Sequence, residues 1–135
     1  MSEVWREITR PEVYAMRTTA VLLILCLALP GTADPFGPKA VRASAGNVFR
    51  LEVAKVHWKD LEGLDGYGAA STGGAPLAEA PIESAGMIVL GSEAHGLSRH
   101  DLKLVTVPLS DGVESLNVAA AAAVILFEIR RRRLR

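Results

Sequence analysis

The sequence predicts an α/β fold built on a parallel sheet, and three features of its pattern support this. A continuous apolar run, residues 20–29, has the composition of a buried strand, and two shorter runs follow at 85–90 and 105–109. The segments between them favour short helices and turns. The chain ends in a long alanine-rich segment that begins near Ser115, and alanine is the best helix former. Strands that alternate with helices are typical of parallel sheets.

The apolar run at 20–29 has a second interpretation. It follows Met16 and Arg17 and precedes Pro30-Gly31-Thr32-Ala33, so residues 16–33 resemble a secretory signal with its cleavage site. About ten apolar residues are too few to cross a bilayer as a helix. We favour the buried strand, and an exported protein that starts at Met16 is the alternative. No membrane association is expected.

The elements between the strands follow from glycine and proline positions. Residues 34–38 predict a turn, and residues 39–47 a short helix that begins after a proline and stops near a glycine. Residues 48–56 predict a loop and strand, 61–67 a helical turn, 68–72 a brief strand and 73–83 a surface loop. The alanine-rich helix carries apolar side chains on more than one stripe, so it is expected to be buried on most sides, with Ser115 as a plausible N-cap.

Composition excludes several kinds of site. The 135 residues suffice for one domain of ordinary size, with 15 basic and 15 acidic residues. A single cysteine, Cys26, excludes an internal disulfide and favours a reducing compartment, and the three histidines show no metal-ligand spacing with it. No metal is expected. Aromatic residues are few, so a stacking platform for nucleic-acid bases is not predicted.

The charges are unevenly distributed, because five arginines fall within the last six residues. The chain before them then holds 10 basic and 15 acidic residues. Such a basic end is able to contact nucleic acid or an anionic surface. The simpler interpretation is that these cations complete the C-terminus of a helix and fray into solvent.

A candidate site lies in the last third of the chain. The strand at 85–90 breaks into a glycine-bearing loop that holds Glu93 between Gly91 and Gly96, and the strand at 105–109 leads to Ser115 and Asn117. In parallel sheets, ligands bind beyond the carboxyl ends of the strands, where both loops are expected. Glycines there let the backbone approach a small molecule closely. No phosphate-loop motif is present.

The polar residues of these loops have more than one possible role. Glu93 is suited to act as a general base, or to order a neighbouring loop by accepting backbone N–H bonds. Ser115 and Asn117 are placed to cap a helix or to position a ligand hydroxyl. His95 has no nucleophile at a useful spacing and is interpreted as structural or solvent-facing.

Two segments, VLGSEAHGLS and VTVPLSDGVESLNVAAAAAVILFE, closely resemble the second and third motifs of the SpoU, or TrmH, branch of the SPOUT RNA methyltransferases. The preceding DPFGPKAVRASAGNVFRLEV, residues 34–53, is similar to a segment found in many members. The resemblance covers residues 20–131. We therefore expect residues 20–135 to form a SpoU-type methyltransferase domain, incomplete because its first motif is missing, after an atypical N-terminal segment at 1–19.

The resemblance implies a parallel-sheet SPOUT fold with a C-terminal trefoil knot, S-adenosylmethionine as cofactor, and cytoplasmic homodimers that methylate a ribose 2′-hydroxyl in tRNA or rRNA. Glu93, Ser115 and Asn117 match the polar site residues of the family, and Arg42 matches a residue expected to help hold the substrate. The residues expected to line the cofactor, largely through backbone groups, are Leu90, Gly91, Gly96, Val107, Leu109, Leu116 and Asn117.

One departure from the family pattern affects the expected activity. Family members carry an upstream motif of asparagine, glycine and arginine, and that arginine is usually assigned to activation of the hydroxyl. Residues 1–17 contain no such pattern, and the stretch between Ser98 and Val105 is a few residues shorter than usual. Two hypotheses follow: an RNA 2′-O-methyltransferase, or a truncated, inactive remnant that dimerises and binds S-adenosylmethionine or RNA.

Overall fold

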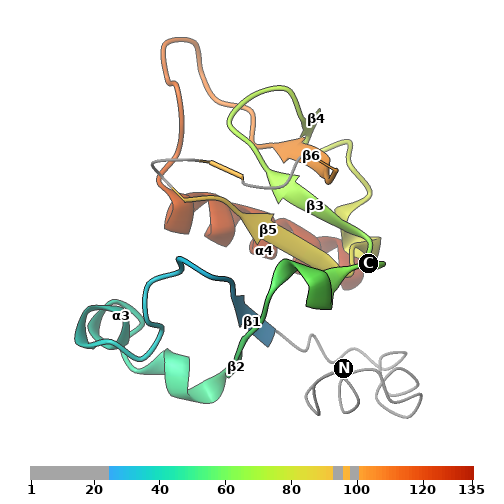
Figure 1. Ribbon diagram of the computed structural model, residues 1–135. Helices are drawn as coiled ribbons and strands as arrows, with labels where there is room; N and C mark the ends of the chain where they lie inside the picture. Colours follow the sequence, from blue (N-terminus) through green and yellow to red (C-terminus); the bar gives the residue numbers. More distant parts are fainter. Residues whose placement is uncertain (1–24, 93–95, 98–100) are drawn as a thin grey trace. The chain divides into compact units, whose positions relative to one another are not determined.

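The computed structural model describes residues 25–92, 96–97 and 101–135 of the chain (Figure 1). The chain divides into two compact units, Met1–Glu62 and Gly63–Arg135. Each unit is described by itself below. Glu93 and His95 lie outside the described residues, as do residues 1–24 and 98–100.

The first unit contains a parallel pair of strands, in which Leu25 lies opposite Glu52 and Ala28 opposite Lys55. Two of its short helical elements lie in the chain between those strands. The elements, in order, are β1 (Leu25–Ala28), α3 (Pro38–Ala43), η2 (Asn47–Arg50), β2 (Glu52–Lys55) and η3 (Trp58–Leu61), where η denotes a 3-10 helix.

The sequence predictions for this unit agree with the structure in part. The end of the apolar run, Leu25–Ala28, forms a strand rather than a helix, as the favoured interpretation requires. The predicted helix at 39–47 forms but ends early, at Ala43. Its end is early because Ala45 (φ 49°) and Gly46 (φ 77°) adopt left-handed backbone conformations that an α-helix cannot include.

The second unit is built on a four-stranded sheet with all neighbouring strands parallel, in the order β4-β6-β3-β5 (Figure 1). Two strands that are close in sequence, β3 and β4, are therefore separated by β6. The confirmed α/β prediction of a parallel sheet rests on these strands: β3 (Gly66–Ala69), β4 (Ala75–Pro76), β5 (Met87–Leu90) and β6 (Lys103–Thr106).

Two elements before β4 begin and end at other residues than the sequence predicted. The predicted helical turn at 61–67 is wrong, because η3 already ends at Leu61 and β3 begins at Gly66. The strand expected at 68–72 therefore starts two residues earlier. Gly66 explains why: a side chain there would overlap the backbone carbonyl of Met87 on β5, so only glycine lets these two strands pair.

The segment at 73–83, predicted as a surface loop, instead supplies part of the core. Leu77, Ala80 and Ile82 are all buried, and Ile82 is 0% exposed. The segment contains β4 at its start and leads into the short helix η4 (Ile82–Ser84). The alanine, glycine and proline composition concealed this, because the three buried side chains follow neither a strand nor a helix period.

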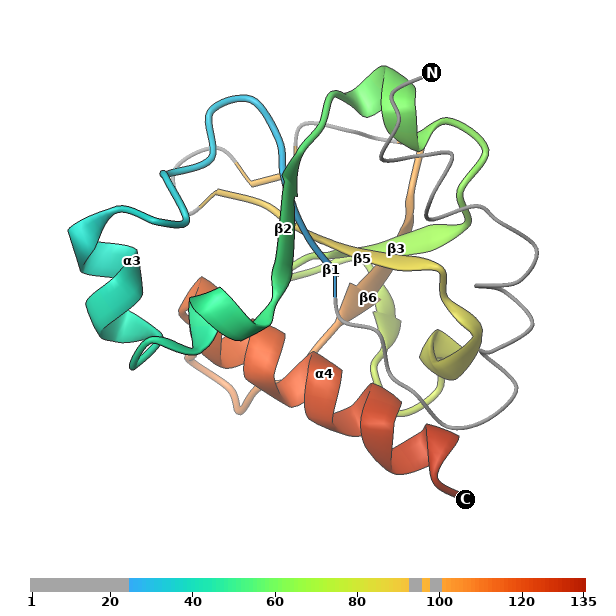
Figure 2. The ribbon, with the colours of Figure 1, turned by 90° about the horizontal axis from the view of Figure 1, so that it is seen from below.

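Helix α4 (Val118–Arg133) packs along the sheet of the second unit (Figure 2). Its Ile125 and Ile129 are buried against Tyr67, Ile82 and Val105. The N-cap is Asn117 rather than Ser115: the Asn117 side chain accepts hydrogen bonds from Ala119 N (2.9 Å) and Ala120 N (3.4 Å). Ser115, two residues earlier, lies in the loop before the helix.

The prediction that this helix is buried on most sides is wrong for the described residues. Only Ile125 and Ile129 of α4 are buried, whereas Val124, Leu126 and Phe127 are 42%, 39% and 68% exposed. The sequence could not show whether one face of this helix is buried or most of them, because apolar side chains occur on all its sides. Which of them are covered depends on the segments that pack against the helix. Within the described residues, no helix is both long and apolar enough to cross a membrane.

The prediction that the C-terminal arginines extend into solvent is wrong for some of them. Arg131 and Arg132 pair with Glu128 of the same helix, and Arg132 and Arg133 donate hydrogen bonds to backbone carbonyls between residues 77 and 85. Arg132 and Arg133 therefore connect the last turn of α4 to the segment between β4 and β5.

Candidate functional site

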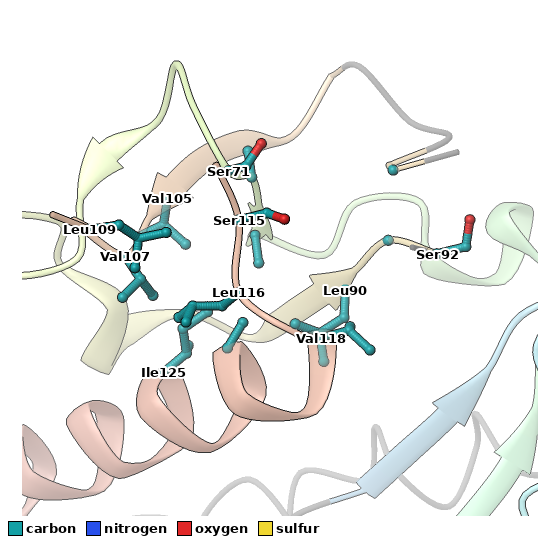
Figure 3. Close-up of a pocket in the computed structure, with 15 residues that line it drawn as sticks. Ser71, Leu90, Ser92, Val105, Val107, Leu109, Ser115, Leu116, Val118 and Ile125 are labelled. Carbon is teal, nitrogen blue, oxygen red and sulfur yellow. The ribbon is translucent and has the colours of Figure 1, made fainter. Parts of the chain in front are cut away.

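The second unit has a pocket at the carboxyl ends of three adjacent strands, β3, β5 and β6 (Figure 3). Parallel sheets place ligand sites at this edge, because the loops that leave neighbouring strands diverge there. The pocket has a volume of about 200 Å³. Pockets that enclose an entire cofactor-sized ligand measure about 300–1,000 Å³, so this pocket accommodates part of such a ligand. The lining residues are Ala69, Ala70, Ser71, Leu90, Gly91, Ser92, Gly96, Val105, Val107, Leu109, Ser115, Leu116, Val118, Ala121 and Ile125.

In the wall after β5, Ser92 and Gly96 are bound to each other through their backbones. Ser92 N donates to Gly96 O (3.1 Å), and Gly96 N donates to Ser92 O (2.8 Å). These bonds bring the backbones of Gly91 and Gly96 together so closely that a side chain at Gly91 would overlap the Gly96 carbonyl. Gly96 has φ 62°, which glycine adopts without strain. Both glycines are therefore required by the shape of this wall.

The opposite wall comes from the loop before α4 and from the first turns of that helix. Figure 3 shows Leu116, Val118 and Ile125 on this side, with Ser115 above them. Most of the lining side chains are aliphatic or absent, and no described lining residue is charged. Such a wall binds an apolar group by contact and leaves backbone N–H and C=O groups to make the specific hydrogen bonds.

The structure brings together most of the predicted site residues. All six residues expected to line the cofactor besides Asn117 lie in the pocket wall, and so does Ser115. Asn117 lies at the start of α4, where its side chain caps the helix. Glu93 lies outside the described residues. Arg42 is an exposed residue of α3 and belongs to the first unit, whereas the pocket belongs to the second.

Two hydroxyl-bearing residues of the pocket were not predicted from the sequence. Ser71 follows β3, and Ser92 follows Gly91 in the turn after β5 (Figure 3). Ser71 could have been found only with the strand order, because β3 lies between β5 and β6 in the sheet although it precedes both in sequence. Among the described residues, no three His, Cys, Asp or Glu side chains are grouped closely enough to hold a metal ion.

Asn117→Ala is expected to lower the free energy of unfolding by about 0.5–2 kcal/mol, because it removes the cap from two backbone N–H groups of α4. Asn117→Asp keeps the accepting oxygen and should retain most of the stability. Chemical denaturation of both variants checks this. If Asn117→Ala were as stable as the wild type, the cap would contribute nothing measurable.

Together, the sheet and its pocket define a class of protein: a parallel α/β protein with a mostly apolar, glycine-walled ligand site at the carboxyl ends of its strands. The SpoU rRNA Methylase family model matches residues 14–127. The chain belongs to this family.

Relatives and solved structures agree with the assignment. The Bacillus subtilis 23S rRNA (guanosine(2553)-2′-O)-methyltransferase RlmP is 37% identical over 111 residues, which cover 74% of this chain and 44% of that protein. A TrmH-family RNA methyltransferase structure from Porphyromonas gingivalis matches with 36% identity and a TM-score of 0.65, over 78% of this chain and 48% of that one.

An AdoMet-bound rRNA methyltransferase from Sinorhizobium meliloti matches with 27% identity and a TM-score of 0.67, over 78% of this chain and 45% of that one. These similarities confirm the predicted SPOUT-type α/β fold. The chain spans less than half the length of each of these three proteins.

Proposed function

We propose that this protein binds S-adenosylmethionine in the pocket of the second unit and methylates a ribose 2′-hydroxyl in tRNA or rRNA. The observation that carries the proposal is the pocket itself. Six residues that the family resemblance assigns to the cofactor come from separate segments and line one pocket at the carboxyl ends of the strands. Family membership and the rRNA 2′-O-methyltransferase relatives support the same function.

The pocket walls fit this cofactor. The close approach of Gly91 to Gly96 leaves backbone rather than side chain facing a ligand, which suits recognition through N–H and C=O groups. Leu90, Leu109 and Leu116 offer apolar contact to a base or a methionyl chain. When bound, the cofactor supplies a methyl group on a positively charged sulfur.

The chain itself must prepare the ribose hydroxyl. A hydroxyl is a poor nucleophile, so a base of this chain would have to accept its proton for the oxygen to take up the methyl group that the cofactor would supply. We assign this proton transfer, or the ordering of the loop beside it, to Glu93. Ser115 and Asn117 are proposed to position the hydroxyl, and Arg42 to hold the RNA. Alignment of the two reacting atoms can contribute more to the rate than proton transfer does.

Two measurements test the proposal. Calorimetry with S-adenosylmethionine should show binding by the wild type, and a methyl-transfer assay on bulk tRNA and rRNA should show turnover that Glu93→Ala reduces by about 100-fold or more. Binding with no turnover would favour the alternative, a non-catalytic remnant. If the folded protein binds no S-adenosylmethionine, it is neither an active methyltransferase nor a remnant that binds this cofactor.

We further propose that the protein forms a homodimer through the exposed face of α4. This face is defined by Ala119, Ala120, Ala123, Val124, Leu126 and Phe127, and all six residues are exposed. Small side chains let two helices approach closely, while the larger ones supply apolar contact area. No acidic or basic residue falls between Val118 and Phe127, so nothing opposes burial of this stretch against a second copy.

Phe127→Asp is expected to convert the dimer to a monomer, because it places a charge at the most exposed large side chain of this face. Sedimentation velocity measures the change. Val113→Asp is the matched control: Val113 is 51% exposed but lies in the loop before α4, so its substitution should leave the dimer intact. A wild-type protein that sediments as a monomer at all accessible concentrations would contradict the proposal.

Two further features of the family remain predictions for this chain. The trefoil knot is consistent with the matched fold but needs the connections through residues 93–100, part of which lie outside the described residues. The cytoplasmic location is the second prediction, and an RNA substrate is compatible with it. Fractionation of cells that express a tagged full chain tests the location, and a membrane-bound or exported product would contradict it.

A further inference from the structure

The first unit carries an exposed pair of aromatic rings. Phe36 and Phe49 are thirteen residues apart, yet their ring centroids lie 6.1 Å from one another with an interplanar angle of 28°. The aromatic count predicted no stacking platform, and only the folded backbone brings this pair together. Phe36 is 48% exposed and Phe49 is 68% exposed, so the pair faces solvent in the described chain.

Local structure holds the pair in place. Phe36 N donates to the Asp34 carboxylate (3.1 Å), which fixes the turn that presents the first ring. Phe49 is part of η2, and its neighbour Val48 is buried and anchors that short helix. The Ser44 hydroxyl also accepts from Val48 N (3.4 Å). The rings therefore stand outward because the residues beside them are fixed.

The stretch of sequence that carries the two rings is rich in cations, and the acidic residues Asp34 and Glu52 border it. Residues 35–51 contain Lys39, Arg42 and Arg50 and no acidic residue. All three cations are exposed. This stretch is exceptional in a chain that, before its last six residues, carries more acidic than basic groups. Exposed rings flanked by cations are the combination that binds single-stranded nucleic acid, in which bases stack on the rings and phosphates meet the charges.

We propose that Phe36 and Phe49, with Lys39 and Arg50, form a binding surface for unpaired RNA, on which one base stacks against the outer ring of Phe49. The inference rests on the proposed function, since it specifies the kind of RNA that the protein recognises. A base in a duplex is already stacked on both sides, so the surface selects single strands, loops or bulges.

The test measures binding of a fluorescein-labelled oligouridine, and of an RNA duplex of equal length, by fluorescence anisotropy with the full chain. Phe49→Leu should weaken binding of the single strand by about 5- to 150-fold, the range for loss of one stacked base. Duplex binding should change little. Leu51→Ala is the matched control, because Leu51 is an exposed apolar residue of the same unit that carries no ring.

Two further variants separate stacking from charge. Phe49→Trp should retain affinity, and its added fluorescence should be quenched by the single strand beyond any change seen in the wild type. Arg50→Gln should reduce the slope of log affinity against log salt by about 0.7, the value for one phosphate contact on a single strand. Lys59→Gln removes an exposed cation outside residues 35–51 and should leave the slope unchanged.

Each outcome has a distinct meaning. Equal affinity of Phe49→Leu and the wild type for oligouridine would overturn the inference, and so would a change of oligomeric state in Phe49→Leu with no change in RNA affinity. If the wild type binds S-adenosylmethionine and methylates RNA while Phe49→Leu is unaffected in RNA binding, only this inference fails. If the wild type binds neither cofactor nor RNA, the proposed function fails as well.

Discussion

Replacing Gly91 with alanine is expected to weaken binding of S-adenosylmethionine by about 100-fold or more. The added Cβ would overlap the Gly96 carbonyl group and lie 2.6 Å from Leu97 N, and these are backbone atoms that cannot rotate away. The turn would have to open, which breaks the two hydrogen bonds between Ser92 and Gly96. Overpacking of this kind costs about 3 kcal/mol, so calorimetry should show affinity reduced by about 100-fold or more.

The control for this variant is Gly73→Ala in the same unit. Gly73 has φ 75° and open space around its Cα, so alanine there causes only backbone strain, about 1 kcal/mol. It should lower stability slightly and leave cofactor affinity unchanged. Circular dichroism establishes that both variants fold. A folded Gly91→Ala protein with wild-type affinity would show that the turn after β5 does not contact the cofactor.

Arg132→Leu is expected to cause the largest loss of thermal stability among the variants of the C-terminal arginines. The guanidinium donates to Leu77 O (2.6 Å) and Ala80 O (2.7 Å), and both residues are buried. It also pairs with Glu83 and Glu128. Leucine fills similar space but removes the Arg132 donor from both carbonyls. Leu77 O loses this bond, whereas Ala80 O keeps its bond from Ile82 N (2.8 Å), so Tm in a thermal melt should fall by several degrees.

Arg130→Leu is the matched control, because Arg130 is exposed on the same turn of α4. Its Tm should remain close to that of the wild type. Equal melting temperatures for all three proteins would show that the contacts of Arg132 with the segment before η4 do not stabilise the fold. A loss in both variants would instead assign the effect to the charge of the helix end.

The same cluster predicts how stability depends on acid. Hydrogen bonds from Arg131 and Arg132 lower the pKa of Glu128 from 4.5 to about 2. Because the folded-state pKa is the lower one, the stabilisation from this carboxylate is complete above pH 4.5 and is lost as the pH falls towards 2. In Glu128→Gln the stability should be lower at neutral pH, and its decline across this interval should be shallower.

Much of the site was predictable because its signals are local. A strand followed at once by glycine predicts a close backbone approach, and Gly91 and Gly96 provide it. The segment after the last strand, with Ser115 and Asn117, predicts a helix start, although the cap proved to be Asn117. An Asn side chain and a Ser side chain two residues apart are both suitable caps, and only the conformation of the loop selects one.

Other features depend on partners that are distant in sequence. Leu77, Ala80 and Ile82 become core only because α4 lies over them, and Ser71 reaches the pocket only because β3 lies between β5 and β6. The same holds for Arg132, whose hydrogen-bond acceptors lie about fifty residues earlier. Local propensity contains no information about such pairs.

For this protein, the sequence by itself determined the parallel α/β class, the strand ends that carry the ligand loops, and the family, since these follow from hydrophobic runs, glycine positions and two motifs. Only the tertiary structure decided which face of α4 is covered, where the C-terminal arginines bind, and that Phe36 and Phe49 stack as an exposed pair. The physical reason is that burial and side-chain pairing are properties of segments brought together by folding, which the order of residues does not display.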